Sequence, residues 1–136
     1  MNYKRYLKDT QMVTIATCDG NQPRVRPMTL IYMDDKFFFA TGSKDTKNSQ
    51  LLTNPKTEFC LVVSKESGNG YIRGSGVMKI EESFSQKEAV AEHAKFVYDY
   101  WQDPQDPDFV LYELILQQIR FMSPGEMLEE VTDFEQ

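Results

Sequence analysis

Cationic and hydroxyl side chains concentrate in two short segments of the chain, residues 24–28 and 41–47. The first segment is Arg-Val-Arg-Pro-Met and the second is Thr-Gly-Ser-Lys-Asp-Thr-Lys. Arginine and lysine form charge-assisted hydrogen bonds with phosphate oxygens, and hydroxyls and helix-start amides add further donors. The two segments therefore predict a binding site for a phosphorylated ligand, one that does not depend on a glycine-rich phosphate loop.

Each segment also has a simpler explanation. Arg24 and Arg26 share one face of an undistorted strand, and a charged pair in that position usually points to solvent. Ser43 or Asp45 could simply cap the helix that follows, with the nearby lysines exposed. Because one buried strand links the two segments, a shared role in one site is favoured over two unrelated surface features.

The elements that position these groups are mostly strands joined by hairpins. Strands are expected at about residues 12–17, 24–33, 36–41, 58–65, 71–81 and 110–122. Asp-Gly at 19–20 and Asp-Asp at 34–35 mark tight turns between them. Pro27 lies inside the second strand and predicts an edge, a bulge or a break in pairing, any of which leaves backbone groups available to a ligand.

Helices are expected near residues 2–8, from Asp45 to Asn54, and behind a capping box at 85–88. The last of these places apolar side chains on one face, namely Val90, Ala94, Val97 and Trp101. Gly74 and Gly76 indicate a bulge or a close backbone approach. Together these elements predict a mainly β fold, with about six antiparallel strands that close into a small barrel flanked by two or three helices.

Length and composition set the class of protein. The chain has 136 residues, 40% hydrophobic and 26% charged, which predicts a single globular domain over residues 1–136. No apolar run approaches the roughly 20 residues of a membrane-spanning helix, and the N-terminus is a poor signal peptide. Cys18 and Cys60 lie far apart, so we expect inert thiols in a reduced, cytoplasmic protein.

Charge and histidine content exclude other classes. The net charge is -6, and Arg120 is the only basic residue after Lys95. An acidic protein of this kind is a poor partner for nucleic acid, although a small phosphorylated ligand needs only a local positive pocket. His93 is the single histidine, which excludes two-histidine metal sites, and we predict no metal site.

The order and spacing of several short motifs resemble one known family. These motifs are Gly20, Pro23 and Arg26-Pro27-Met28, then Phe38-Phe39-Ala40-Thr41, Lys47 to Leu51, Asn54-Pro55, and Tyr71-Ile72-Arg73-Gly74. Over about residues 10–81 the set is similar to the pyridoxamine 5′-phosphate oxidase-like superfamily of FMN-binding split barrels. The resemblance implies a six-stranded antiparallel split β-barrel that binds FMN at the interface of a homodimer.

The resemblance also implies which residues contact FMN. The isoalloxazine ring would be bordered by Arg24, Val25, Arg26, Pro27 and Met28. Thr41 would end the strand beneath the ligand, with Gly42 next to it as a further contact. Ser43, Thr46 and Lys47 would hold the phosphate, with Arg24 or Arg26 as a second cation. Asn69 and Tyr71 would approach from the strand that reaches FMN in the family, either in the same chain or in the partner chain.

The resemblance implies an oxidoreductase in which FMN passes electrons from a nicotinamide, NADH or NADPH, to a small acceptor. No protein acid or base stands out as catalytic. The C-terminus lacks the arginine- and tryptophan-bearing segment that helps true pyridoxamine phosphate oxidases bind their vitamin substrate, so we do not expect that activity. The alternatives that remain open are a non-catalytic flavin-binding or sensing protein, a haem-binding split barrel with His93 as its ligand, and, on the resemblance in fold alone, a protein with a deazaflavin partner.

Overall fold

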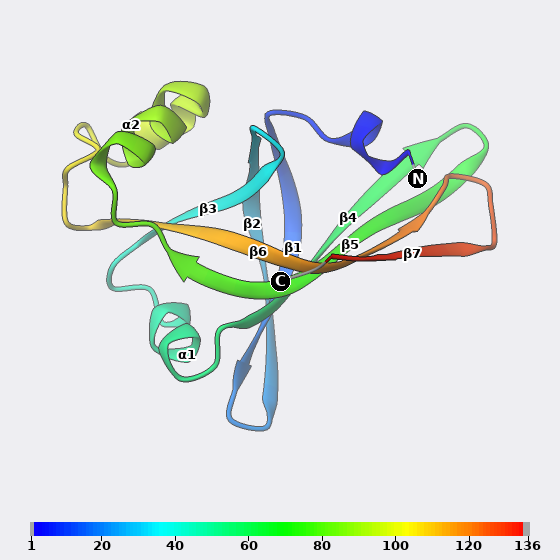
Figure 1. Cartoon of the computed structure of the whole chain (residues 1–136), viewed down its shortest axis with the longest axis horizontal. Helices are drawn as coiled ribbons and strands as arrows, with labels where there is room; N and C mark the ends of the chain where they lie inside the picture. Colours follow the sequence, from blue (N-terminus) through cyan, green and yellow to red (C-terminus); the bar gives the residue numbers. More distant parts are fainter. Residues whose placement is uncertain (1, 135–136) are drawn as a thin grey trace.

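The protein is a seven-stranded antiparallel sheet, six strands of which close into a barrel (Figure 1). The structure, a computed structural model, describes residues 2–134. The strands are β1 (Thr10–Asp19), β2 (Gln22–Met33), β3 (Lys36–Gly42), β4 (Lys56–Lys65), β5 (Gly68–Ile80), β6 (Phe109–Met122) and β7 (Glu129–Asp133). Their order is β3-β2-β1-β4-β5-β6-β7, and β3 also pairs with β6. The six expected strands therefore form the ring, and β7, which was not expected, extends the sheet beyond β6.

The barrel is split between β2 and β3. These strands pair only from Ile31 to Met33, next to the tight turn in which Asp34 and Asp35 have φ of 53° and 59°. The pairing of β2 with β1 is continuous and places Pro27 opposite Thr14. Of the three possibilities for Pro27, the structure shows an edge: within the described chain, the paired residues of β2 before Ile31 have partners on β1 alone.

Two clusters of buried side chains hold the elements together. The larger fills the barrel and includes Ile15, Phe37, Phe59 and Ile72. The second lies where α2 (Phe84–His93) and the 3₁₀ helix η2 (Lys95–Asp99) pack on the outside of the barrel. It contains the four side chains expected on one helical face, Val90, Ala94, Val97 and Trp101.

The helices differ in detail from the expectation. The α-helix gives way to η2 at Ala94, and its N-cap is Ser83, whose hydroxyl accepts a hydrogen bond from the Gln86 amide. The expected cap at Ser85 is therefore wrong by two residues. The N-terminal helix is a single 3₁₀ turn, η1 (Tyr3–Tyr6), and α1 (Lys47–Thr53) ends before Asn54-Pro55 as expected. No helix in the described part of the chain is long and apolar enough to cross a membrane.

Close packing against the neighbouring strands explains Gly74 and Gly76 of β5, and a Cβ atom at Gly74 would lie 2.3 Å from the ring of Phe59. The register between β5 and β6 shifts between Ser75 and Gly76, which is the expected bulge. A Cβ atom at Gly76 would lie 2.0 Å from the carbonyl oxygen of Ile115.

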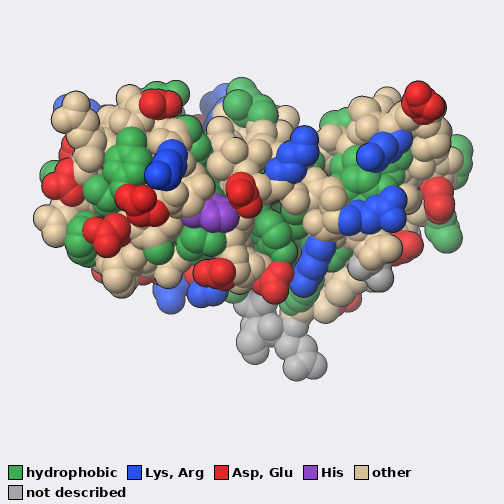
Figure 2. Space-filling view, turned by 90° about the horizontal axis from the view of Figure 1, so that it is seen from above, with side chains coloured by type: hydrophobic (Ala, Val, Ile, Leu, Met, Phe, Trp, Pro, Cys, Tyr) green, Lys and Arg blue, Asp and Glu red, His purple; other side chains and the backbone are tan. Residues whose placement is uncertain are grey.

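On the face shown in Figure 2, acidic side chains are more frequent on the side that carries α2, and basic side chains on the other side. Acidic and basic side chains on that face are therefore concentrated in different regions.

Candidate functional site

A cavity of about 500 Å³ lies where β2 and β3 diverge. Its walls come from β1, β2, β3, the start of α1 and the segment around η2, and its lining residues are Met12, Pro27, Met28, Thr29, Ala40, Thr41, Gly42, Asp45, Lys47, Phe96, Tyr100, Trp101 and Asp108. The volume falls within the roughly 300–1,000 Å³ of small-molecule and cofactor sites. The split in the barrel therefore creates a site of suitable size.

Lys47 is the cation of this cavity, and it is almost completely buried, at 4% exposed. Its Nζ donates to the Thr41 hydroxyl at 2.8 Å and forms an ion pair with Asp45 at 2.6 Å. Lysine is seldom buried to this extent unless it is paired. The simpler explanation, in which the lysine is exposed, is therefore wrong for Lys47.

Asp45 has two contacts with the same lysine. Its Oδ1 accepts a hydrogen bond from the Lys47 backbone amide at 3.0 Å, while its Oδ2 pairs with Nζ. Partial burial raises the pKa of this carboxyl. The hydrogen bonds from Lys47 and the charges of Lys47 and Arg26 together outweigh that effect, so the pKa lies below its ordinary value. The carboxylate is therefore charged at neutral pH and lies directly on the cation of the cavity.

The two arginines of β2 have different surroundings. Arg24 is exposed and pairs with Asp19 at 3.4 Å. Arg26 faces α1, and its Nη2 donates to Gln50 Oε1 at 3.2 Å. In residues 2–134, Arg26 Nη1 is the one buried side-chain nitrogen or oxygen that has no hydrogen-bond partner. A buried guanidinium nitrogen without a partner is costly, so this atom is a strong candidate for binding an anion.

Asp108 connects Trp101, on the η2 side of the cavity, to Ser43 at the end of β3. Its carboxylate accepts hydrogen bonds from the Ser43 hydroxyl at 2.8 Å, the Ser43 amide at 3.1 Å and Trp101 Nε1 at 2.9 Å. The hydrogen bond from Trp101, followed by those from Ser43, lowers the pKa of Asp108 below its ordinary value. The Ser43 hydroxyl is thus engaged in holding the wall.

Aromatic and thioether side chains supply the apolar part of the lining. Phe96, Tyr100 and Trp101 come from η2 and the residues after it and form the aromatic wall of the cavity. Met12 and Met28 come from β1 and β2. Trp101 stacks on Phe109 with ring centroids 5.1 Å apart, which fixes its position, whereas Tyr100 is 72% exposed. These side chains suit contact with a flat ring system.

The structure brings together part of the expected FMN-contacting set. Those that line the cavity are Pro27, Met28, Thr41, Gly42 and Lys47. Arg26 lies beside it through its contact with Gln50 and its charge interaction with Asp45. Outside the lining are Arg24, Val25, Ser43, Thr46, Asn69 and Tyr71. Of these, Val25 is 65% exposed, and Thr46 makes no side-chain capping bond.

Asn69 and Tyr71 belong to a different part of the protein. Asn69 Oδ1 accepts a hydrogen bond from Ser64 in the β4–β5 hairpin, and the Tyr71 hydroxyl donates to Glu129 of β7.

The sequence did not predict that the aromatic wall belongs to the site. The single tryptophan next to a tyrosine was a signal, but its proximity to residues 41–47 depends on Asp108, which is 65 residues from Ser43.

His93, the residue assigned to a haem alternative, has a structural role. Its Nε2 lies 2.9 Å from the carbonyl oxygen of Tyr32 and 3.5 Å from Asp9. It therefore connects α2 to the sheet, and it is not among the residues that line the cavity. This position gives no support to its assignment as a haem ligand.

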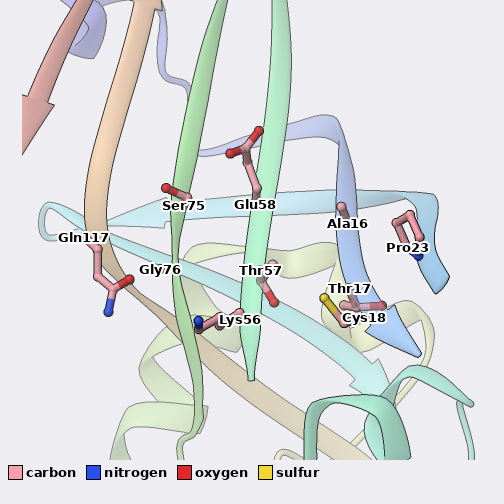
Figure 3. Close-up of a pocket in the computed structure, with 10 residues that line it drawn as sticks. All are labelled: Ala16, Thr17, Cys18, Pro23, Lys56, Thr57, Glu58, Ser75, Gly76 and Gln117. Atoms are coloured by element: carbon pink, nitrogen blue, oxygen red, sulfur yellow. The ribbon is translucent and has the colours of Figure 1, made fainter. Parts of the chain in front are cut away.

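A second hollow of about 340 Å³ lies across β1, β4, β5 and β6 (Figure 3). Lys56 and Gln117 lie on one side of it, and Thr17, Cys18 and Pro23 on the other. Its carboxylate, Glu58, already binds Arg73 at 2.9 Å. None of the twelve expected FMN-contacting residues lines this hollow. The cavity between β2 and β3 is therefore the better candidate.

Six antiparallel strands form a ring in which β2 and β3 pair only near their shared turn and then separate. This arrangement defines the protein as a split β-barrel. The family model for pyridoxamine 5′-phosphate oxidase matches residues 2–123. The protein therefore belongs to that family. None of the curated proteins compared with the chain matches it.

Solved structures confirm the fold. A NimC/NimA family protein from Clostridium acetobutylicum is 21% identical with a TM-score of 0.79, covering 96% of this chain and 89% of that one. A haem-binding protein from Mycobacterium smegmatis is 17% identical with a TM-score of 0.76, covering 92% and 53%. A FAD-binding protein from Mesorhizobium loti is 16% identical with a TM-score of 0.68, covering 82% and 86%. At these identities the likeness concerns the fold alone.

Proposed function

We propose that the protein is an FMN-binding oxidoreductase, with the cofactor in the cavity between β2 and β3. The observation that carries the proposal is a pair of cationic side chains around Asp45: buried Lys47 in the cavity lining, and Arg26 beside the cavity with its unpartnered Nη1. A phosphate group fits that pair, because it accepts several charge-assisted hydrogen bonds and neutralises both cations. Family membership and the FAD-binding neighbour support a flavin.

The lining provides separate surroundings for the two ends of FMN. Lys47 and Thr41 of the lining, together with Arg26 beside it, would hold the phosphate, and Pro27, Met28 and the aromatic wall would hold the ring. Bound FMN would supply acceptance of a hydride from NADH or NADPH and delivery of electrons to a small acceptor. The protein's own part is to place the ring and exclude water from it.

We further propose that the protein acts as a homodimer. Met12 of β1 and Val62 of β4 are 64% and 65% exposed, and both belong to the outward-facing positions of the sheet. Val62 pairs with Tyr71, so the same sheet region carries the expected FMN contact that the cavity of its own chain lacks. A second chain packed here would cover the apolar residues and bring Asn69 and Tyr71 towards the cavity of its partner.

Binding of FMN and of riboflavin, measured by quenching of flavin fluorescence, tests the proposal. Lys47→Gln keeps a hydrogen-bonding side chain of similar length but removes the charge. We expect it to weaken FMN binding by about 10- to 100-fold, the effect of losing a hydrogen bond to a charged group. Riboflavin has no phosphate, so its affinity should change little. Absence of FMN binding by the wild-type protein, in titration and in its visible spectrum, would contradict the proposal.

Steady-state oxidation of NADH and NADPH under air distinguishes an enzyme from a flavin-binding or sensing protein. An oxidoreductase that holds FMN should consume one of the two nucleotides in an FMN-dependent manner. Tight FMN binding without any such turnover, with a range of small acceptors, would favour the non-catalytic alternative.

A further inference from the structure

We propose that Asp45 competes with the ligand phosphate for Lys47 and so sets the preference of the site for phosphorylated over unphosphorylated flavin. The inference rests on the proposed function and concerns the same site. Its starting point is the 2.6 Å ion pair between Asp45 Oδ2 and Lys47 Nζ inside the cavity lining. The carboxylate lies where an anionic ligand would make its contact with this lysine.

Counting donors shows why the two anions compete. A lysine ammonium has three N–H groups. One is directed to the Thr41 hydroxyl and one to Asp45, which leaves a single N–H for any other acceptor. A phosphate that uses only this third group must approach close to the Asp45 carboxylate, and like charges at that separation repel each other. A phosphate that uses two groups must displace one of the present partners.

Burial determines which partner gives way. Thr41 is 5% exposed at the end of β3, whereas the Asp45 side chain is 44% exposed in the loop before α1. The Thr41 hydroxyl is therefore the more firmly held partner. The Asp45 carboxylate can rotate towards solvent if it gives up its contacts with Lys47. Asp108, the other carboxylate of the lining, is held by Ser43 and Trp101, so it has no equivalent movement available.

The substitution Asp45→Asn isolates the effect of charge. The amide oxygen of asparagine retains the ability to accept the hydrogen bond from the Lys47 backbone amide, so the turn into α1 is preserved. Its neutral side chain no longer neutralises Nζ. Asp19→Asn is a matched control, because Asp19 is also a partly exposed acid paired with a cation of the first segment, Arg24.

The experiment measures FMN and riboflavin affinity for wild type, Asp45→Asn and Asp19→Asn. We expect Asp45→Asn to bind FMN about fivefold more tightly, the scale of a partly exposed ion pair, with riboflavin unchanged. Asp19→Asn should match wild type for both ligands. Thermal unfolding of each variant establishes that it is folded.

The possible outcomes separate the two proposals. If the wild-type protein and Asp45→Asn both fail to bind FMN, the proposed function is wrong. If the wild-type protein binds FMN and Asp45→Asn binds it equally or less tightly, the competition proposal is overturned while the proposed function stands. A parallel gain in riboflavin affinity would also overturn it, because such a gain reflects a general change in the cavity.

Discussion

Arg24 and Arg26 show how two residues of the same type, two positions apart, acquire different roles. Arg24 is exposed and pairs with Asp19 across the β1–β2 hairpin, an arrangement that contributes little to stability. Arg26 is directed at Gln50 of α1 and has a buried nitrogen without a partner. The sequence alone left open which arginine was the second cation, and the structure favours Arg26.

This difference leads to a prediction for a pair of matched variants. Arg26→Gln should weaken FMN binding by about 10-fold or more relative to riboflavin, because it removes a charged donor from the proposed phosphate site. Arg24→Gln should change the FMN affinity by less than about twofold. Fluorescence titration of both variants with both flavins provides the measurement. Equal losses in the two variants would contradict the assignment of Arg26.

The position of Lys47 at a helix start could be predicted from the sequence, but its burial and contacts could not. The sequence indicated that Lys47 lies beside a helix start, and the structure places it there. Its burial and its hydrogen bond to Thr41 depend on the position of α1 against β3, which local patterns do not specify. The bond between Ser43 and Asp108 joins residues 65 positions apart, and no spacing rule connects them.

At the scale of elements, the wall made by η2 and the residues after it depends on one carboxylate. Asp108 joins Trp101 to the end of β3 through the hydrogen bonds to Ser43. The hairpins, the approximate positions of six strands and the apolar set of Val90, Ala94, Val97 and Trp101 followed from turn residues and periodicity, although this set runs from α2 into η2 and beyond it. The extra strand β7 did not, because its sequence Glu-Glu-Val-Thr-Asp is acidic and short and pairs only with the end of β6.

The pKa of Asp108 predicts how this wall responds to acid. Because hydrogen bonds from Trp101 and Ser43 lower the pKa in the folded protein, the stabilisation is present above the ordinary aspartate pKa of about 3.9. It is lost as the pH falls through the lower folded-state value. The fluorescence of Trp101, the single tryptophan, should therefore change in a step at a pH below about 3.9.

Asp108→Asn is the control for this step. The variant has no carboxyl at position 108 to protonate, so its tryptophan emission should lack the step, while far-UV circular dichroism identifies any global acid unfolding. A step at or above about pH 4 in the wild type, or an unchanged step in the variant, would show that Asp108 is not its source.

At the scale of the whole molecule, the exposed face of the sheet is the feature that a single chain leaves unexplained. Met12 and Val62 are exposed there, and the strands β4 and β5 around Val62 also carry the ion pair of Glu58 with Arg73. Exposed apolar side chains beside charged groups are typical of a surface that binds another protein. The proposed homodimer accounts for them, and it also gives Tyr71 a place near a cavity.

We expect sedimentation velocity to show a dimer at micromolar concentration. Val62→Asp should shift the protein to monomers and weaken FMN binding, because it places a charge in the proposed interface. Leu52→Asp is a matched control on α1, where Leu52 is 77% exposed. A monomeric wild-type protein, or dissociation by Leu52→Asp alone, would argue against this interface.

The closure of the barrel by β3 and β6 has a consequence for the order of assembly. β1 and β2 form a local hairpin, whereas β3 must wait for residues 109–114 before its second edge is paired. The hydrogen bond between Ser43 and Asp108 forms at the same stage, because Asp108 directly precedes β6. Pairing between distant segments is slow compared with hairpin formation. We therefore expect Asp108 to reach Ser43 and complete the cavity lining only when the adjoining strand β6 docks, which makes the cavity one of the last parts of the fold to form.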